Sequence, residues 1–211
     1  MRMFLTFFLL LAVSALAPAQ GAIAPTVLVF GDSLSAGYGI DVDQSWPALL
    51  QSRLTSQGYE HRVINASISG ETTEGGKTRI GPALQRFNPE LVILELGGND
   101  GLRGFPTEVM KDNLKTIIET TKSSGAAVVI LGIRIPSNYG PRYTQAFESV
   151  YRELSEQLGV LWIEFLMDGV ASNEALMQDD GIHPNADAQL ALLDNAWPII
   201  RQALTEYSNK Q

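Results

Sequence analysis

The chain has 211 residues, a formal net charge of −8 and no cysteine. Its content of 45% apolar and 18% charged residues is typical of a folded globular protein that is long enough to bury a sizeable core. The acidic balance, without a long basic run, argues against nucleic acid as a partner. The lack of cysteine excludes disulfides and thiol nucleophiles, and only His61 and His183 can supply an imidazole.

The first residues form a predicted export signal. Arg2 precedes a largely apolar run over residues 3–17, which is too short to span a bilayer comfortably. The small residues at 17–19 are of the kind that a signal peptidase accepts. We therefore predict a signal peptide over residues 1–19, cleaved at its end or a few residues later, and one domain over residues 20–211. The predicted location is a bacterial periplasm or the external medium, and a retained N-terminal anchor is the alternative.

Five short apolar runs, rich in β-branched residues, predict strands that are covered on both faces. In chain order they span residues 26–30, 61–64, 91–96, 126–131 and 160–163. Helical spacing of apolar residues predicts helices over residues 46–54, 73–86, 143–158 and 186–204. Three glycines weaken the second of these helices, and Pro198 is expected to kink or shorten the last one.

The alternation of strands with helices predicts a single three-layer α/β/α domain, in which a five-stranded parallel sheet lies between two layers of helices. In an open parallel sheet, functional groups gather just beyond the carboxyl ends of the strands. We therefore expect the chemistry in the loops that follow residues 30, 64, 96, 131 and 163, and in the turn before the last helix.

The first of these loops is Gly31-Asp32-Ser33-Leu34-Ser35. The glycine permits a tight turn, and the turn would place Ser33 over the edge of the sheet, beside the start of a helix. The segment is not the G-x-S-x-G turn of α/β-hydrolases, because position 35 is serine. A plain turn with a helix-capping serine is the alternative interpretation.

The next two loops offer groups that bind negative charge. Gly70, after the second run, can present its backbone N–H to an anion without a side chain in the way, although it also fits a plain strand-to-helix turn. Asn99, after the third run, lies among three glycines, so its amide can project and stabilise a developing oxyanion. A flexible turn with Asn99 in a left-handed conformation is the alternative.

An aspartate and a histidine precede the last helix. Asp180 and His183 are three residues apart on a turn that Pro184 stiffens, so the carboxylate can orient the imidazole as a general base. The other histidine, His61, begins a predicted strand and therefore lies at the opposite edge of the sheet. A metal site made of Asp32, Asp180 and His183 is a further alternative, although common metal signatures are absent.

Together, these segments resemble the SGNH (GDSL) hydrolase family. The four blocks of that family match, in order, around Ser33, Gly70, Asn99 and His183. Longer stretches are similar to its bacterial periplasmic branch of acyl-thioesterases, lysophospholipases and arylesterases. These stretches are residues 31–38, 65–70, 95–104 and 177–185.

The resemblance implies a flavodoxin-like sheet with strand order 2-1-3-4-5, and a Ser-His-Asp hydrolase without a cofactor or metal. It implies that Ser33 attacks the acyl carbonyl, His183 transfers the proton and Asp180 orients His183. It also implies that the oxyanion hole consists of the Ser33 N–H, the Gly70 N–H and the Asn99 side-chain amide.

The expected substrates are small acyl esters and thioesters, including aryl esters and lysophospholipids, cleaved by a monomer that is not inserted in a membrane. Ile135 and Pro136 are expected to line an acyl groove, beside Leu102 in a mobile flap over residues 102–106; packing of Ile135 on a helix is the alternative. Two other functions remain open: a carbohydrate acetylesterase of the same family, and a flavodoxin-like module that binds FMN or phosphate. The binding module would not need Asp180 and His183 together.

Overall fold

The computed structural model describes residues 24–208, so the predicted signal peptide lies outside the described residues. Its centre is a five-stranded sheet in which all neighbours are parallel, in the order β2-β1-β3-β4-β5. The strands are β1 (Thr26–Gly31), β2 (Arg62–Asn65), β3 (Leu91–Glu95), β4 (Ala127–Leu131) and β5 (Leu161–Ile163). All bounds lie within one residue of the predicted ones, and the order is the flavodoxin-like order that the resemblance implied.

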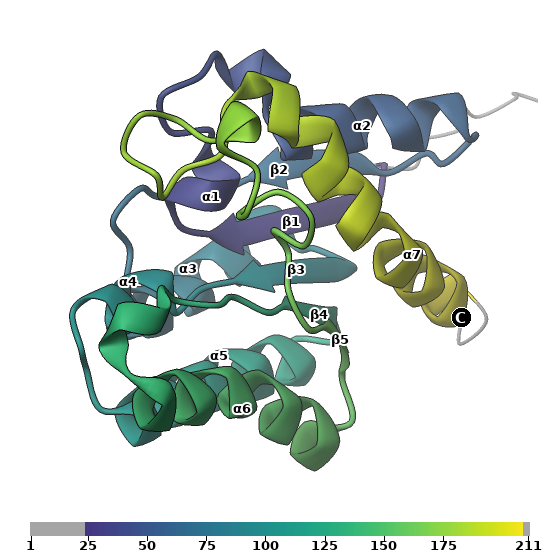
Figure 1. The fold of residues 1–211 in the computed structure, drawn as a ribbon. Helices are drawn as coiled ribbons and strands as arrows, with labels where there is room; N and C mark the ends of the chain where they lie inside the picture. Colours follow the sequence, from purple (N-terminus) through teal and green to yellow (C-terminus); the bar gives the residue numbers. More distant parts are fainter. Residues whose placement is uncertain (1–23, 209–211) are drawn as a thin grey trace, which may run out of the picture.

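Helices cover both faces of this sheet (Figure 1). The helices are α1 (Ser33–Ala36), α2 (Trp46–Ser56), α3 (Thr73–Phe87), α4 (Gly98–Leu102), α5 (Thr107–Ser123), α6 (Pro141–Leu158) and α7 (Gln189–Ser208). Helices α3, α5 and α6 pack on one face, and α2 and α7 pack on the other (Figure 1). The predicted three-layer α/β/α architecture is therefore confirmed.

The strand side chains alternate between two hydrophobic cores. In β1, Leu28 and Phe30 belong to the core beneath α3, α5 and α6, whereas Val27 and Val29 belong to the core beneath α2 and α7. All four side chains are fully buried. Successive strand residues point to opposite faces, so a strand that is apolar at every position is stable only between two covering layers. This is why the apolar runs predict a parallel sheet.

The last helix differs from its prediction in two respects. Residues Ala186–Ala188 form a separate 3-10 turn, and α7 then continues through Pro198 to its end, so the expected shortening does not occur. Ile200 and Leu204, which follow the proline, are buried in the core. Their burial stabilises the second half of α7 and outweighs the backbone hydrogen bond that the proline removes.

Helix α3 forms in spite of its three glycines. The Thr72 side chain caps its first turn by accepting a hydrogen bond from the Gly75 N–H, and Ile80 and Leu84 are buried against the sheet. The cap and the buried face offset the low helix propensity of glycine. The start of this helix is thereby held at the edge of the sheet where the candidate site lies.

Candidate active site

The loop after β1 turns directly into α1 and brings Ser33 to the edge of the sheet. A Cβ atom on Gly31 would lie 2.7 Å from Glu95 Oε2, so this turn requires glycine. Asp32 caps α1, because its side chain accepts a hydrogen bond from the Leu34 N–H at 3.1 Å. Ser33 is the first residue of the helix, a position at which the backbone N–H has no intrahelical acceptor.

The turn before α7 holds His183 against Ser33. The distance from His183 Nε2 to Ser33 Oγ is 2.9 Å, and the distance from His183 Nδ1 to Asp180 Oδ2 is 2.7 Å. Asp180 Oδ1 accepts two further hydrogen bonds, from the N–H groups of His183 and Ile182. The bonds from His183, followed by that from Ile182, lower the pKa of Asp180 to about 2. The imidazole therefore lies between a hydroxyl and an ionised carboxylate.

Of the two histidines, only His183 lies at this edge. The Tyr38 ring packs on the His183 ring, with centroids 4.5 Å apart and planes inclined by 39°. His61 lies next to the start of β2, where its Nε2 is 3.2 Å from Glu90 Oε2. The predicted location of His61 at the opposite edge of the sheet is therefore confirmed.

The two predicted oxyanion-hole residues outside α1 lie on neighbouring segments. Asn99 Nδ2 donates to the Glu71 carbonyl oxygen at 2.9 Å and to Asp32 Oδ2 at 3.2 Å. Gly70 has a φ of +79°, a conformation that favours glycine, and its carbonyl oxygen accepts from Arg103 at 3.2 Å. Within residues 24–208, no acceptor is bonded to the Gly70 N–H. This group is therefore available to a ligand.

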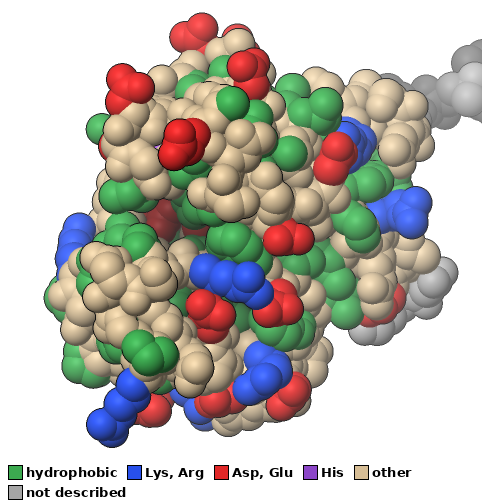
Figure 2. Space-filling model, in the orientation of Figure 1, with side chains coloured by type: hydrophobic (Ala, Val, Ile, Leu, Met, Phe, Trp, Pro, Cys, Tyr) green, Lys and Arg blue, Asp and Glu red, His purple; other side chains and the backbone are tan. Residues whose placement is uncertain are grey.

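An apolar pocket of about 490 Å³ opens beside Ser33 and His183, a size that suits a small ligand. Its lining includes the three predicted substrate-contacting residues, Leu102, Ile135 and Pro136. Ile135 is also buried in the same core as residues of α6, as the helix-packing alternative expects, and its contact with an acyl group stays a prediction. Gly70 and Asp180 do not line the pocket. Figure 2 shows the surface hollowed at the left of the molecule, with hydrophobic side chains beside the hollow.

The predicted flap is bonded to the loop and helix beside it. Tyr139 donates from its hydroxyl to the Leu102 carbonyl oxygen at 2.7 Å, and Tyr143 donates to the Phe105 carbonyl oxygen at 2.6 Å. These bonds link residues 102–106 to the segment that carries Ile135. Movement of the flap stays a prediction.

Two acidic side chains are buried behind Ser33. Glu95 Oε2 accepts from the Ser35 hydroxyl at 2.7 Å and from the Asp32 N–H at 3.4 Å. Burial raises the pKa of Asp32 to about 6; burial, together with the nearby Asp32 charge, raises the pKa of Glu95 well above its usual range. Within the described residues, the buried Glu95 Oε1 has no hydrogen-bond partner. Burial therefore disfavours the charged form of both carboxyl groups.

This acidic pair was not predicted from the sequence, which left open whether Glu95 is buried and perturbed. A usable signal existed, because Glu95 interrupts an otherwise apolar run that is predicted to be buried on both faces. A glutamate in such a position needs a buried partner or a proton. The identity of the partner depends on the pairing of β1 with β3, which places Gly31 beside Glu95.

The alternative metal site is not formed. Within the described residues, no group of three or more His, Asp and Glu side chains is placed to hold a metal ion. The two ring nitrogens of His183 contact Ser33 and Asp180 instead, and Asp32 faces Asn99 and Glu95.

The sheet order and the side chains collected at its edge define the class of SGNH hydrolases. The chain belongs to the GDSL-like Lipase/Acylhydrolase family, whose model matches residues 29–191. It is therefore a carboxylic ester hydrolase, and the family predicted from the four sequence blocks is confirmed.

Two relatives and one solved structure show how far the similarity extends. "Esterase TesA" of Pseudomonas aeruginosa is 47% identical over 185 residues, which cover 88% of this chain and 92% of that protein. "Thioesterase 1/protease 1/lysophospholipase L1" of Escherichia coli K12 is 43% identical over 175 residues, 83% of each chain. The structure described as "Crystal Structure of TesA" matches with a TM-score of 0.83 at 47% identity, over 84% of this chain and 99% of that one.

Proposed function

We propose that this protein is an exported serine esterase that cleaves acyl esters and thioesters through an acyl-enzyme on Ser33. The observation that carries the proposal is the 2.9 Å contact between Ser33 Oγ and His183 Nε2 beside an apolar pocket. The names of the relatives support it, since one is called an esterase and the other a thioesterase and lysophospholipase.

The first half-reaction acylates the enzyme. The Ser33 hydroxyl attacks the acyl carbonyl carbon, and His183 Nε2 takes the hydroxyl proton. The Asp180 carboxylate beside Nδ1 fixes the tautomer and stabilises the imidazolium that forms. The tetrahedral intermediate then breaks its bond to the leaving group, and His183 returns the proton to the departing alcohol or thiol.

The second half-reaction restores the enzyme. His183 takes a proton from water, the resulting hydroxide equivalent attacks the acyl carbon, and the acid leaves as the proton returns to Ser33 Oγ. No cofactor or metal takes part in these steps.

Three donors stabilise the oxyanion in this proposal: the Ser33 N–H, the Gly70 N–H and the Asn99 amide. Asn99 Nδ2 carries two hydrogens, which bond to the Glu71 carbonyl oxygen and to Asp32. We expect the oxyanion to replace the longer bond, which runs 3.2 Å to Asp32. A donor of this kind typically contributes about 3 to 4 kcal/mol to transition-state stabilisation.

The lining of the pocket favours an acyl chain. Leu102, Ile135 and Pro136 present apolar surface beside Ser33, which suits a short to medium acyl group better than the polar ring of a carbohydrate acetyl ester. The family membership removes the reason for the alternative flavodoxin-like binding module.

The proposal includes the setting in which the enzyme works. The signal peptide predicted over residues 1–19 supports export to the periplasm or the medium. In the part of the chain that the structure describes, no helix is long and apolar enough to cross a membrane. We propose a monomer that acts on small-molecule substrates.

A substrate panel tests the proposal. Wild type and Ser33→Ala are assayed with p-nitrophenyl esters from acetate to decanoate, an acyl-CoA, lysophosphatidylcholine and acetylated xylan. We expect wild type to cleave the acyl esters and the thioester, and Ser33→Ala to lose about 10⁴-fold or more in kcat. Full activity in Ser33→Ala would exclude this nucleophile, and a marked preference for acetylated xylan would favour a carbohydrate acetylesterase.

The same panel tests the acyl groove. Ile135→Ala enlarges the pocket beside Ser33, so the preferred acyl chain should become longer. Thr116→Ala, on the exposed face of α5, is the matched control and should keep the wild-type preference. An unchanged chain-length profile in Ile135→Ala would remove this side chain from the groove.

A further inference from the structure

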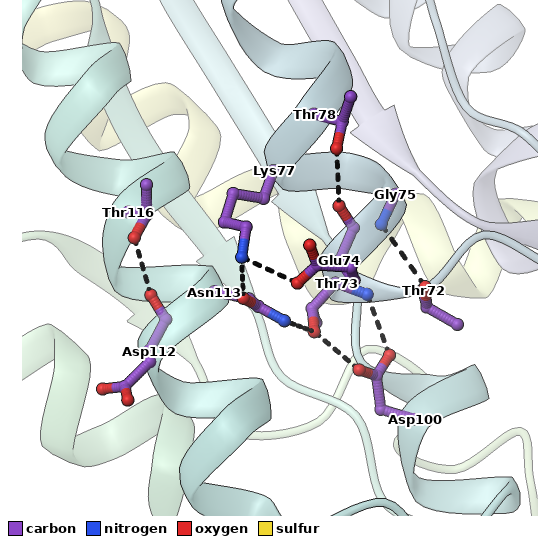
Figure 3. Close-up of polar contacts among 10 residues, drawn as sticks. All are labelled: Thr72, Thr73, Glu74, Gly75, Lys77, Thr78, Asp100, Asp112, Asn113 and Thr116. Carbon is purple, nitrogen blue, oxygen red and sulfur yellow. Dashed lines mark hydrogen bonds and ion pairs between the residues drawn. The ribbon is translucent and has the colours of Figure 1, made fainter.

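A buried set of hydrogen bonds joins α3, α4 and α5 behind the candidate oxyanion hole (Figure 3). Asp100, next to Asn99 in α4, accepts two hydrogen bonds from Thr73, the first residue of α3: one from its N–H at 2.9 Å and one from its hydroxyl at 2.6 Å. Thr73 Oγ1 in turn accepts a bond from Asn113 Nδ2 of α5 at 3.2 Å. All three of these bonded residues are buried, and Thr73 has no exposed surface. We call Lys77, Asn113, Thr73 and Asp100 the Thr73 network.

Lys77, at the exposed end of the Thr73 network, determines which group donates and which accepts in each of its hydrogen bonds. The Lys77 ammonium can only donate, and it donates to Asn113 Oδ1 at 2.7 Å, so Asn113 must present its NH₂ group to Thr73 (Figure 3). The Thr73 hydroxyl accepts that bond and directs its own hydrogen to Asp100. Each group donates to the next, and the network ends on carboxyl oxygens. Its members therefore have a single mutually consistent arrangement.

Besides the Thr73 network, a second hydrogen bond links α4 to the residues at the start of α3. Asn99 Nδ2 donates to the Glu71 carbonyl oxygen at 2.9 Å, and Thr73 follows Glu71 by two residues. One bond between two segments permits rotation about it, whereas two bonds fix both their separation and their orientation. Gly70 itself is held by one hydrogen bond from Arg103 to its carbonyl oxygen, at 3.2 Å.

We propose that Thr73, Asp100 and Asn113 are positioning residues that set the separation between the Gly70 N–H and the Asn99 amide. The catalytic consequence rests on the proposed function, but the placement of the Asn99 amide is a property of the folded protein alone. Donors to an oxyanion must lie within a few tenths of an ångström of their places, and a misplacement of about 1 Å can cost about 100-fold in rate. A loosened Thr73 network should therefore lower kcat.

Thr73→Val tests the proposal, because valine keeps the volume of threonine but removes its hydroxyl. The matched control is Thr121→Val: Thr121 is equally buried, and among the residues that the structure describes its hydroxyl bonds only to the Ile117 carbonyl oxygen of its own helix, at 2.8 Å. We expect Thr73→Val to lower kcat about 10- to 100-fold with KM within about twofold. Thr121→Val should keep the wild-type kcat, and Thr73→Ser, which retains the hydroxyl, should restore it to within about threefold.

A second readout does not depend on activity. The side-chain NH₂ signals of Asn99 are followed by ¹H–¹⁵N NMR in the free protein and assigned by their loss in Asn99→Asp. They should move in Thr73→Val and stay in place in Thr121→Val. Lys77→Met changes the exposed end of the Thr73 network, and the Asn99 signals should move less in this variant than in Thr73→Val. If Thr73→Val does not fold, the Asn99 signals of Lys77→Met decide whether the network positions the Asn99 amide.

Two results would overturn the proposal: unmoved Asn99 signals in both network variants, or equal losses of kcat in Thr73→Val and Thr121→Val. Failure of the proposed function would look different. Ser33→Ala would then keep full activity, and the Asn99 signals alone would decide whether the Thr73 network positions this amide.

Discussion

Acidic side chains lie on both sides of Ser33, in opposite environments. Asp180 lies on an exposed turn, and its hydrogen bonds with His183 and Ile182 lower its pKa to about 2. Asp32 and Glu95 are buried behind the serine, where burial raises the pKa of Asp32 to about 6 and that of Glu95 well above its usual range. The charged form is therefore favoured at Asp180 and disfavoured at Asp32 and Glu95.

This difference separates two roles. The charge on Asp180 faces an imidazole that becomes positive during the proposed reaction, so its ionisation serves the rate. The buried pair instead accepts hydrogen bonds from Leu34, Ser35 and Asn99, so it organises the turn that carries Ser33. Substitutions of Asp180 should therefore lower mainly the activity, and substitutions of Asp32 or Glu95 should lower mainly the stability.

Asp180→Asn should have the largest effect. Asparagine can still accept the backbone bonds but lacks the charge that stabilises the imidazolium, so we expect kcat to fall by about 10³- to 10⁴-fold. The free energy of unfolding should stay within about 1 kcal/mol of wild type, because interactions of exposed charges contribute little. Steady-state kinetics and urea unfolding measure the two effects. A variant with nearly full kcat would show that the exposed carboxylate is not needed.

The substitutions Glu95→Gln and Glu95→Leu should distinguish the loss of the carboxyl group's charge from the loss of its hydrogen bonds. Glu95→Gln keeps the size of the side chain and an acceptor for the Ser35 hydroxyl, so it should unfold within about 1 kcal/mol of wild type. Glu95→Leu leaves buried donors unpaired and should cost about 2 to 3 kcal/mol. Chemical unfolding at pH 7 tests this order. A glutamine variant as unstable as the leucine variant would mean that Glu95 is ionised in the folded protein.

The raised pKa of Asp32 should also make the free energy of unfolding depend on pH. Because the pKa of Asp32 is raised from 3.8 to about 6, the folded state binds more protons between these values, and stability falls as the pH rises through this window. The lowered pKa of Asp180 acts in the opposite direction and at lower pH, where its stabilisation is lost as the pH falls from about 4 to 2.

Urea unfolding from pH 4 to pH 7 in wild type and Asp32→Asn measures this effect. Relative to the variant, wild type should lose about 2 to 3 kcal/mol across the range. Parallel curves would contradict the raised pKa of Asp32.

Much of the fold could be predicted because strands that are buried on both faces consist of apolar residues at every position. The run at residues 26–30 is apolar at every position since its side chains fill two cores, and its bounds were predicted to within one residue. Pro198 was expected to kink or shorten the last helix; the helix is not shortened there, and local propensity does not include the burial of Ile200 and Leu204 beyond the proline.

The site could be predicted only where a residue type is rare or a loop is distinctive. His183 was proposed for the site because it is one of two histidines, and Asn99 because glycines surround it. The Thr73 network was not found, since Thr73, Asp100 and Asn113 are common polar residues with no periodic pattern. They come together through the packing of α3, α4 and α5.

In the proposed mechanism, Ser33 is the nucleophile because His183 activates it. The most direct measurement treats the protein with diethyl p-nitrophenyl phosphate and locates the phosphoryl adduct by intact mass and peptide mapping. We predict one adduct per chain, on Ser33, formed as esterase activity disappears, and no adduct in His183→Ala under the same conditions. An adduct on another residue that abolishes activity while Ser33 stays unmodified would contradict the claim.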